Sequence, residues 1–197
     1  MNKAFSGRVV WVVGASGAIG SAITERLAGE GATVIVSSRS LQNLNRLVEQ
    51  GLPDQHLSAV PVDIGDASSV GGALATILSA HGRIDGLVNT TSISAFGPFL
   101  DLDDATWMQV LDTKVMGYVR TMRACLPHMV SAGRGSIVNI SGRSGRQPSS
   151  AHLPGGCANA AINLLGKGVA DAYRASGIRV NTVAPGPIRS DRLEKLK

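Results

Sequence analysis

The chain has 197 residues, of which 44% are hydrophobic and 17% charged, and its formal net charge is +5. This length and composition suit one globular domain with a sizeable core and exclude a small scaffold that needs disulfides. The two cysteines, Cys125 and Cys157, lack the spacing of a metal site, and no stretch approaches the roughly 18 apolar residues of a membrane span. We therefore expect a cytoplasmic protein with no metal and no membrane partner.

The positive charge is scattered along the chain, and only 4% of the residues are aromatic. This pattern excludes the clustered basic and aromatic surface that is typical of nucleic-acid binding, so we expect no nucleic-acid partner. A mildly basic surface is one interpretation. The alternative is that part of the charge binds a phosphorylated cofactor, because two loops contain Arg143, Arg146, Arg189 and Arg192.

The pattern of residues 8–27 is that of a strand leading into a phosphate-facing helix. Apolar, β-favouring residues 8–13 precede the glycine-rich segment 14–20, and helix-forming residues follow. A side chain at Gly14 or Gly20 would block the close approach that brings free N–H groups and the helix dipole to a diphosphate. An ordinary strand-to-helix turn is the alternative.

The next predicted strand, residues 33–37, closes a βαβ unit of the length that dinucleotide-binding folds use. Sites that prefer NAD place an acidic residue after this strand to hold the ribose hydroxyls. Here Ser38 and Arg39 follow instead, and the guanidinium of Arg39 offers donors for a 2′-phosphate. We expect NADP(H) to be preferred over NAD(H); a solvated loop arginine is the alternative.

Helix and strand patterns alternate over the rest of the chain. Helical periodicity and strand character occur in turn over residues 41–50, 57–62, 66–81, 84–89, 107–129, 135–140, 158–174 and 178–184. Asp66 and either Asp103 or Asp104 are candidate helix caps, and Pro127 is a candidate kink. The alternation, without repeats or a linker, predicts a single α/β domain over 1–197 with a Rossmann-like, doubly wound parallel sheet.

In this order the pieces resemble the short-chain dehydrogenase/reductase family over essentially the whole length. The matching stretches are residues 14–20, 63–64, 89, 135–141 and 179–188. The resemblance implies that the diphosphate and nearby ribose are bound by Gly14, Ser16, Ile19 and Gly20.

The same resemblance implies roles for residues at other strand ends. Asp63 and Ile64 would hold the adenine, and Asn89 would lie on the adenosine ribose side; capping of strand ends is the alternative for Asp63 and Asn89. The nicotinamide would be approached by Pro185, Gly186 and Ile188, with Ser190 on its carboxamide.

The catalytic positions differ from the family pattern, which has a serine, a Tyr-x-x-x-Lys pair and a helix asparagine. The serine position falls on Gly142, the Tyr and Lys positions fall on Gly155 and Asn159, and the asparagine position holds Lys114. Lysine and asparagine are thus exchanged. Divergent members of the family combine this exchange with a tyrosine seven residues before the asparagine, and here that residue is His152.

Two interpretations of these residues follow. In the first, Lys114 supplies positive charge, Asn159 donates to the ribose, and His152 is the acid that protonates a carbonyl oxygen. In the second, His152 is a loop histidine, and Lys114 is a helix lysine whose ammonium reaches solvent. Ser141 and Ser144 are candidate replacements for the missing serine.

We therefore expect an NADP(H)-dependent oxidoreductase that acts on a small carbonyl or alcohol substrate with non-standard catalytic residues. The alternative is a catalytically inactive NADP(H)-binding sensor or oligomer partner. Family members continue beyond the Pro-Gly turn with helices that cover the substrate, whereas this sequence ends at Lys197. Either this sequence omits a following segment, or the site is open and the sheet edge near the sixth strand is exposed, which would favour pairing with another subunit. We expect a homodimer or homotetramer.

Overall fold

A parallel sheet forms the centre of the computed structural model, which describes residues 3–51, 56–93 and 95–188. Its six strands are β1 (Val9–Val13), β2 (Thr33–Ser37), β3 (His56–Ala59), β4 (Gly86–Asn89), β5 (Gly135–Ile140) and β6 (Ile178–Val183). All neighbours pair in parallel, in the order β3-β2-β1-β4-β5-β6. The chain direction across the sheet reverses between β1 and β4, where doubly wound folds bind their ligands. The predicted single α/β domain is confirmed.

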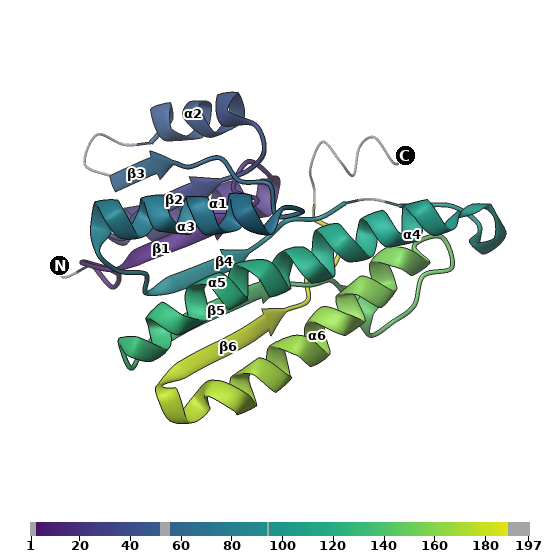
Figure 1. Ribbon diagram of the computed structural model, residues 1–197. Coiled ribbons are helices and arrows are strands. Elements are labelled where there is room, and N and C mark those ends of the chain that lie inside the picture. The colour runs from purple at the N-terminus through teal and green to yellow at the C-terminus, as the bar shows by residue number, and fades with distance from the viewer. Residues whose placement is uncertain (1–2, 52–55, 94, 189–197) are drawn as a thin grey trace.

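Helices cover both faces of the sheet. They are α1 (Ala18–Gly29), α2 (Leu41–Glu49), α3 (Ala67–His81), α4 (Asp104–Val110), α5 (Gly117–Ser131) and α6 (Leu153–Tyr173). Figure 1 shows α3, α5 and α6 in front of the sheet, where they pack on the Val9, Trp11 and Val13 side of β1. Helices α1 and α2 pack on the opposite side, against Val10 and Val12. No helix within the described ranges is long and apolar enough to cross a membrane.

Two of the predicted helix starts are confirmed by side-chain caps. The Asp66 carboxylate accepts the N–H groups of Ser68 and Ser69 at the start of α3, and Asp103 accepts that of Thr106 at the start of α4. The predicted single helix over 107–129 is wrong in detail, because a π-helical segment, Leu111–Met116, joins α4 to α5. Pro127 lies inside α5, which continues to Ser131.

Helix α6 begins five residues before the predicted start at 158. His152 is its N-cap, and Pro154 lies in the first turn, where a missing N–H costs no hydrogen bond. The predicted helix did not include the two glycines at 155 and 156. In the structure they belong to the helix, so His152 and position 155 lie within one turn of each other.

The opposite edge of the sheet is held together by Asp85. Its carboxylate accepts the Val9 N–H at 2.9 Å and pairs with Arg83, with Arg8 at 3.4 Å and with Arg134 at 3.6 Å. Burial opposes ionisation of this carboxyl group, but the hydrogen bonds from Arg83 and Val9 and the nearby arginine charges together hold its pKa below the ordinary value. Asp85 thus links the starts of β1, β4 and β5.

Candidate cofactor-binding and catalytic site

The turn between β1 and α1 has no room for side chains at two of its glycines. Gly14 has φ +84°, and a Cβ there would lie 2.6 Å from Thr90 Oγ1. A Cβ at Gly20 would overlap the carbonyl oxygen of Gly14 and lie 2.8 Å from the Ala15 Cα. The N–H groups of Gly14 and Ala15 both donate to the Ser37 carbonyl oxygen, which ties the turn to the end of β2. The backbone therefore approaches α1 more closely than any other residue type would allow.

The first turn of α1 faces this tight backbone without a side-chain cap. Gly17 is the N-cap in an extended conformation, and no side chain bonds to the first N–H groups. Ser16 is exposed beside them, and Ile19 is half-buried. A 12-residue helix with an uncapped N-terminus presents backbone donors and the positive end of its dipole, which is the donor set that a diphosphate requires.

The predicted adenosine-side residues lie at the carboxyl ends of their strands, but only some are accessible. Arg39 is exposed two residues after β2, and Asp63 is exposed after β3, with its carboxylate accepting the Gly65 N–H at 2.9 Å. Ile64 is buried instead, and its side chain packs against Gly117. Accessible contacts at this edge therefore come from Arg39 and Asp63.

The Asn89 side chain, predicted to lie on the adenosine ribose side, points into the core. The side chain is fully buried: its amide donates to Asn139 Oδ1 at 3.0 Å, and its oxygen accepts from Thr121 Oγ1 at 2.9 Å. These bonds join β4, β5 and α5 in the core. Because the amide is already paired on both sides, its function in this structure is to hold the strands in register.

The loop that follows β6 lies beside the segment that follows β5, and backbone hydrogen bonds join the two. The Arg143 N–H donates to the Pro185 carbonyl oxygen at 2.9 Å, and the Ser141 N–H donates to Val183 at the same distance. Gly186 and Ile188 follow and are exposed. Ser190, predicted to bind the carboxamide, lies outside the described residues, as do Arg189 and Arg192.

His152 lies at the start of α6 and is fixed by the β4–α4 loop. Its Nδ1 is 3.0 Å from the Ala95 carbonyl oxygen, and its ring stacks on Phe96 with centroids 4.3 Å apart and planes at 17°. A Cβ at Gly155 would overlap the imidazole at Nε2 and Cε1. The imidazole of His152 therefore occupies the space that a side chain at position 155 would enter.

Asn159 has the same relation to Gly142. A Cβ at Gly142 would lie 2.7 Å from Asn159 Nδ2, so the asparagine amide fills the space beside that residue. The Asn159 side chain is only 5% exposed, and its Nδ2 donates to Ser144 Oγ at 2.9 Å. Its Oδ1 is buried with no hydrogen-bond partner among the described residues. A buried acceptor of this kind is a place for a ligand donor.

Lys114 is buried, at 5% exposure, which contradicts the interpretation of a helix lysine whose ammonium reaches solvent. It lies in the π-helical segment, which packs against α6, the helix that carries Asn159. Segments of this kind are frequent at functional sites. Leu111 and Val115 of this segment pack in the same small cluster as Ala158 of α6, and we call the region where the segment meets the start of α6 the corner. A buried ammonium such as that of Lys114 is costly unless it is paired.

The two candidate serines differ in their surroundings. Ser141 is buried, with its Oγ 3.3 Å from the Val183 carbonyl oxygen, which makes it part of the β5–β6 junction. Ser144 lies in the turn Arg143–Gly145 and receives the Asn159 hydrogen bond. Of the two hydroxyls, Ser144 is the one that the structure brings to the corner.

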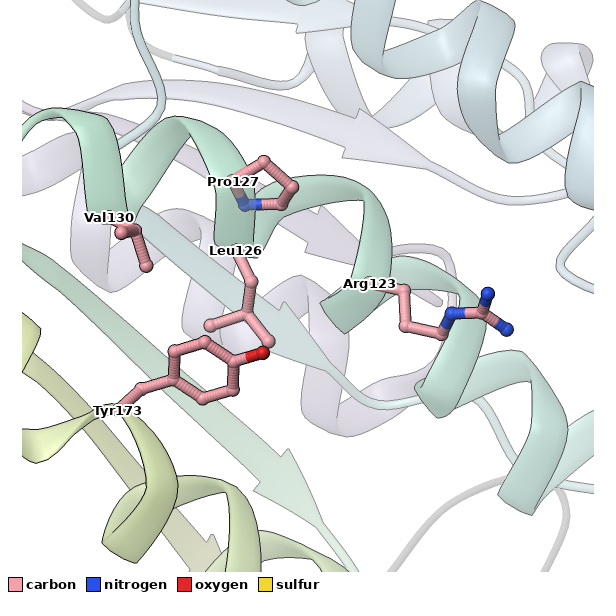
Figure 2. A pocket seen from close by; sticks show the side chains of 5 residues that line it. All are labelled: Arg123, Leu126, Pro127, Val130 and Tyr173. Carbon is pink, nitrogen blue, oxygen red and sulfur yellow. The ribbon is translucent and has the colours of Figure 1, made fainter.

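Neither of the chain's two tyrosines can supply a phenol to this corner. Tyr118 is fully buried, its hydroxyl lies 3.0 Å from the carbonyl oxygens of Thr91 and Ile140, and burial raises its pKa. Tyr173 is the last residue of α6, about 30 Å from His152 by helix rise. Tyr173 lines a hollow of about 350 Å³ together with residues of α5. Figure 2 shows its ring beside Leu126.

The family model for the short chain dehydrogenases matches residues 8–197. The chain belongs to the short-chain dehydrogenase family. Curated members include the bovine dehydrogenase/reductase SDR family member 4, which is 34% identical over 93% of this chain and 66% of its own length. The 3-oxoacyl-[acyl-carrier-protein] reductase of Thermotoga maritima is 31% identical over 96% of this chain and 78% of its own length.

Solved structures agree with this assignment. The NAD⁺-bound xylitol dehydrogenase superposes on this short-chain dehydrogenase with a TM-score of 0.93 at 26% identity, over 97% of this chain and 74% of that one. Relatives in the family are oxidoreductases, and the family binds nicotinamide cofactors. Among the residues that the structure describes, no group of three or more His, Cys, Asp or Glu side chains could hold a metal ion.

The contribution of Ala95 and Phe96 to the corner was not predicted. Their loop is 57 residues from His152 in the sequence, and no periodic pattern links the two segments. The only local signal in the sequence is Phe96 itself, an aromatic residue after the polar segment that follows β4. Its residue type does not identify the side chain that it contacts. The contact is a property of the tertiary structure.

Proposed function

We propose that this short-chain dehydrogenase is an NADP(H)-dependent oxidoreductase for a carbonyl or alcohol substrate, with His152 in place of the usual acidic phenol. The observation that carries the proposal is the overlap between the His152 imidazole and a side chain at Gly155. The position that holds the phenol in the family pattern is glycine here, and an imidazole, which can donate or accept a proton, fills that space.

The residues at the β1–α1 turn fit a dinucleotide. Gly14 and Gly20 leave a tight backbone, the N-terminus of α1 offers uncapped donors, and Arg39 is exposed where an adenosine 2′-phosphate would lie. When bound, the nicotinamide supplies a hydride to a carbonyl carbon or accepts one from an alcohol. The chain's own contribution is to hold the diphosphate and orient the ring toward the corner at α6.

Three side chains at the corner transfer the proton, stabilise charge and bind the nicotinamide ribose. His152 gives a proton to the carbonyl oxygen in reduction, and in oxidation it takes one from the alcohol. The buried Lys114 ammonium stabilises negative charge that develops on that oxygen. Asn159 has a free buried Oδ1 that can accept a hydroxyl of the nicotinamide ribose. This acceptor role is added to the expected donor role, because one N–H of Nδ2 donates to Ser144 and the Oδ1 acceptor is unpaired among the described residues.

Hydride transfer to a panel of ketones and aldehydes, followed as NADPH absorbance, tests the proposal. We expect turnover by the wild-type chain and a kcat lower by about 10²–10⁴-fold in His152→Phe, with little change in NADPH affinity. Lys114→Met keeps the length of the side chain and removes its charge, and it should also reduce kcat. His128→Phe, an exposed histidine on α5, is the matched control. Tight NADPH binding without turnover on any substrate would contradict the proposal.

The second candidate function is NADP(H) binding without redox chemistry, in a sensor or oligomer partner. It is favoured by the absence of a hydroxyl at Gly142 and Gly155 and by the apolar hollow between α5 and α6 (Figure 2), which suits self-association. Light scattering with and without NADPH tests it. A cofactor-dependent change in mass without turnover supports this function, and turnover excludes it. A homodimer or homotetramer and a cytoplasmic location stay predictions.

A further inference from the structure

The β4–α4 loop contacts the start of α6 in three ways over three consecutive residues. The Ala95 carbonyl oxygen lies 3.0 Å from His152 Nδ1, the Phe96 ring stacks on the imidazole, and the Gly97 N–H donates to the Ala151 carbonyl oxygen at 3.1 Å. One side-chain-to-backbone hydrogen bond and one backbone hydrogen bond thus flank one ring contact. The segment 95–97 and residues 151–152 form a single clamp around the imidazole.

The clamp rests on a small buried cluster. Ala95 packs with Val110 of α4 and Ala158 of α6, and all three are at most 7% exposed. The carbonyl group that contacts His152 is therefore fixed to both helices. A hydrogen-bond acceptor held in this way orients a side chain more precisely than one in a mobile loop.

The contact with Ala95 determines the tautomer of His152. A carbonyl oxygen can only accept a hydrogen bond, so Nδ1 must carry the proton. In the neutral ring Nε2 then has a lone pair, and in the imidazolium it carries the exchangeable proton. The overlap at Gly155 places that edge of the ring in the space of the family's reacting side chain.

Phe96 restricts the remaining motion of the ring. Phe96 is 44% exposed, and its ring contacts the imidazole instead of packing in the core. Nearly parallel stacking at 4.3 Å opposes rotation of the imidazole out of its plane. Together the carbonyl group and the phenyl ring leave one orientation of His152.

We propose that Phe96 is a positioning residue that, with the Ala95 carbonyl group, fixes His152 so that Nε2 is the atom that exchanges the substrate proton. This inference rests on the proposed function. In reduction, the proton leaves imidazolium Nε2 for the carbonyl oxygen while NADPH gives a hydride, and thus two electrons, to the carbonyl carbon. The products are an alcohol, NADP⁺ and a neutral imidazole protonated at Nδ1, which regains its Nε2 proton from solvent.

Nuclear magnetic resonance of the protein labelled with ¹⁵N-histidine tests the clamp without any turnover. The His152 signals are assigned among the four histidines by their loss in His152→Gln. At alkaline pH, where the imidazole is neutral, we expect the Nδ1–H tautomer in the wild type and a mixture of both tautomers in Phe96→Ala. Phe99→Ala is the matched control, because Phe99 lies on the same loop and its ring is edge-on to Trp107.

The kinetic arm uses the same variants. Phe96→Ala should lower kcat by about tenfold to hundredfold with the KM for NADPH unchanged, because the imidazole is misaligned and the cofactor site is intact. Phe96→Tyr keeps the stacking and should restore most of kcat, and Phe99→Ala should leave it close to wild type.

The outcomes separate this inference from the proposed function. The Nε2–H tautomer in a wild-type protein that turns over overturns the inference alone, as does identical behaviour of Phe96→Ala and Phe99→Ala in both arms. Absence of turnover by the wild type, with the Nδ1–H tautomer present, overturns the proposed function and the catalytic use of the clamp, while its geometry stands.

Discussion

In two regions, the β1–α1 turn and the corner at α6, glycines lie where a side chain would clash. The atoms that such a side chain would meet differ between the two regions. Gly20 faces backbone atoms of the turn itself, whereas Gly142 and Gly155 face the side chains of Asn159 and His152. Backbone atoms cannot move without changing the turn, while side chains can be exchanged between positions. The comparison shows that the shape of the β1–α1 turn depends on the main chain, whereas the space around Gly142 and Gly155 depends on which side chains fill it.

We expect the largest effect on binding and stability at Gly20, where a side chain would meet backbone atoms. Gly20→Val forces α1 away from the turn, so we expect NADPH affinity to fall more than about hundredfold and the free energy of unfolding to fall by about 3 kcal/mol. Isothermal titration and urea unfolding measure the two quantities. Gly29→Ala, at the open end of the same helix, should leave binding unchanged; wild-type affinity in Gly20→Val would show that the turn does not hold the cofactor.

We expect a smaller effect at Gly155, where a side chain would meet the His152 ring. Gly155→Ala pushes the His152 ring from its place, so we expect kcat to fall by about tenfold or more while NADPH affinity stays within about twofold. Gly168→Ala on the same helix has open space around it and serves as the control. If Gly155→Ala retained full kcat, the position of the imidazole would not matter for turnover.

Substitution of Arg39 tests the predicted preference for NADPH over NADH. Loss of a charge-assisted contact with a 2′-phosphate in Arg39→Ala should raise the Kd for NADPH by about tenfold to hundredfold and leave that for NADH unchanged. Fluorescence titration with both cofactors measures this, and Arg46→Ala, an exposed arginine on α2, is the comparison variant. Equal affinity of the wild type for the two cofactors would defeat the argument.

The smallest effect on the site is expected at Asp85, on the opposite edge of the sheet. Asp85→Asn should lower the free energy of unfolding by about 2 kcal/mol at pH 7 and leave both binding and kcat unchanged. Because the folded-state pKa is lowered, the stabilisation is complete above the unfolded-state value of about 3.9 and is lost as the pH falls through the folded-state value.

Urea unfolding from pH 7 to pH 3 checks this dependence. The difference between wild type and Asp85→Asn should shrink toward the acid end, and Asp171→Asn, an exposed carboxylate on α6, should show little difference at any pH. A constant difference across the range would mean that the charge of Asp85 does not stabilise the fold.

The sequence was a good guide wherever neighbouring residues determine the structure. Alternating periodicity predicted the six strands in order, and the glycine spacing predicted the close turn before α1. It was a poor guide where long-range packing overrides local preference. The predicted helix began at residue 158, yet the glycines at 155 and 156 lie in the first turns of α6, where contacts with the β4–α4 loop hold the preceding His152.

The sequence by itself determined the family, the α/β sheet and the tight turn between β1 and α1, because each depends on residues that are close along the chain. The tertiary structure alone decided that Lys114 is buried, that the Asn89 amide faces the core, and that the His152 ring fills the space at Gly155. These facts depend on contacts between segments 30 to 60 residues apart, such as Ala95 with His152 and Asn89 with Asn139, which are separated by 57 and 50 residues. Side-chain packing across that separation is set by the whole fold, and no local pattern encodes it.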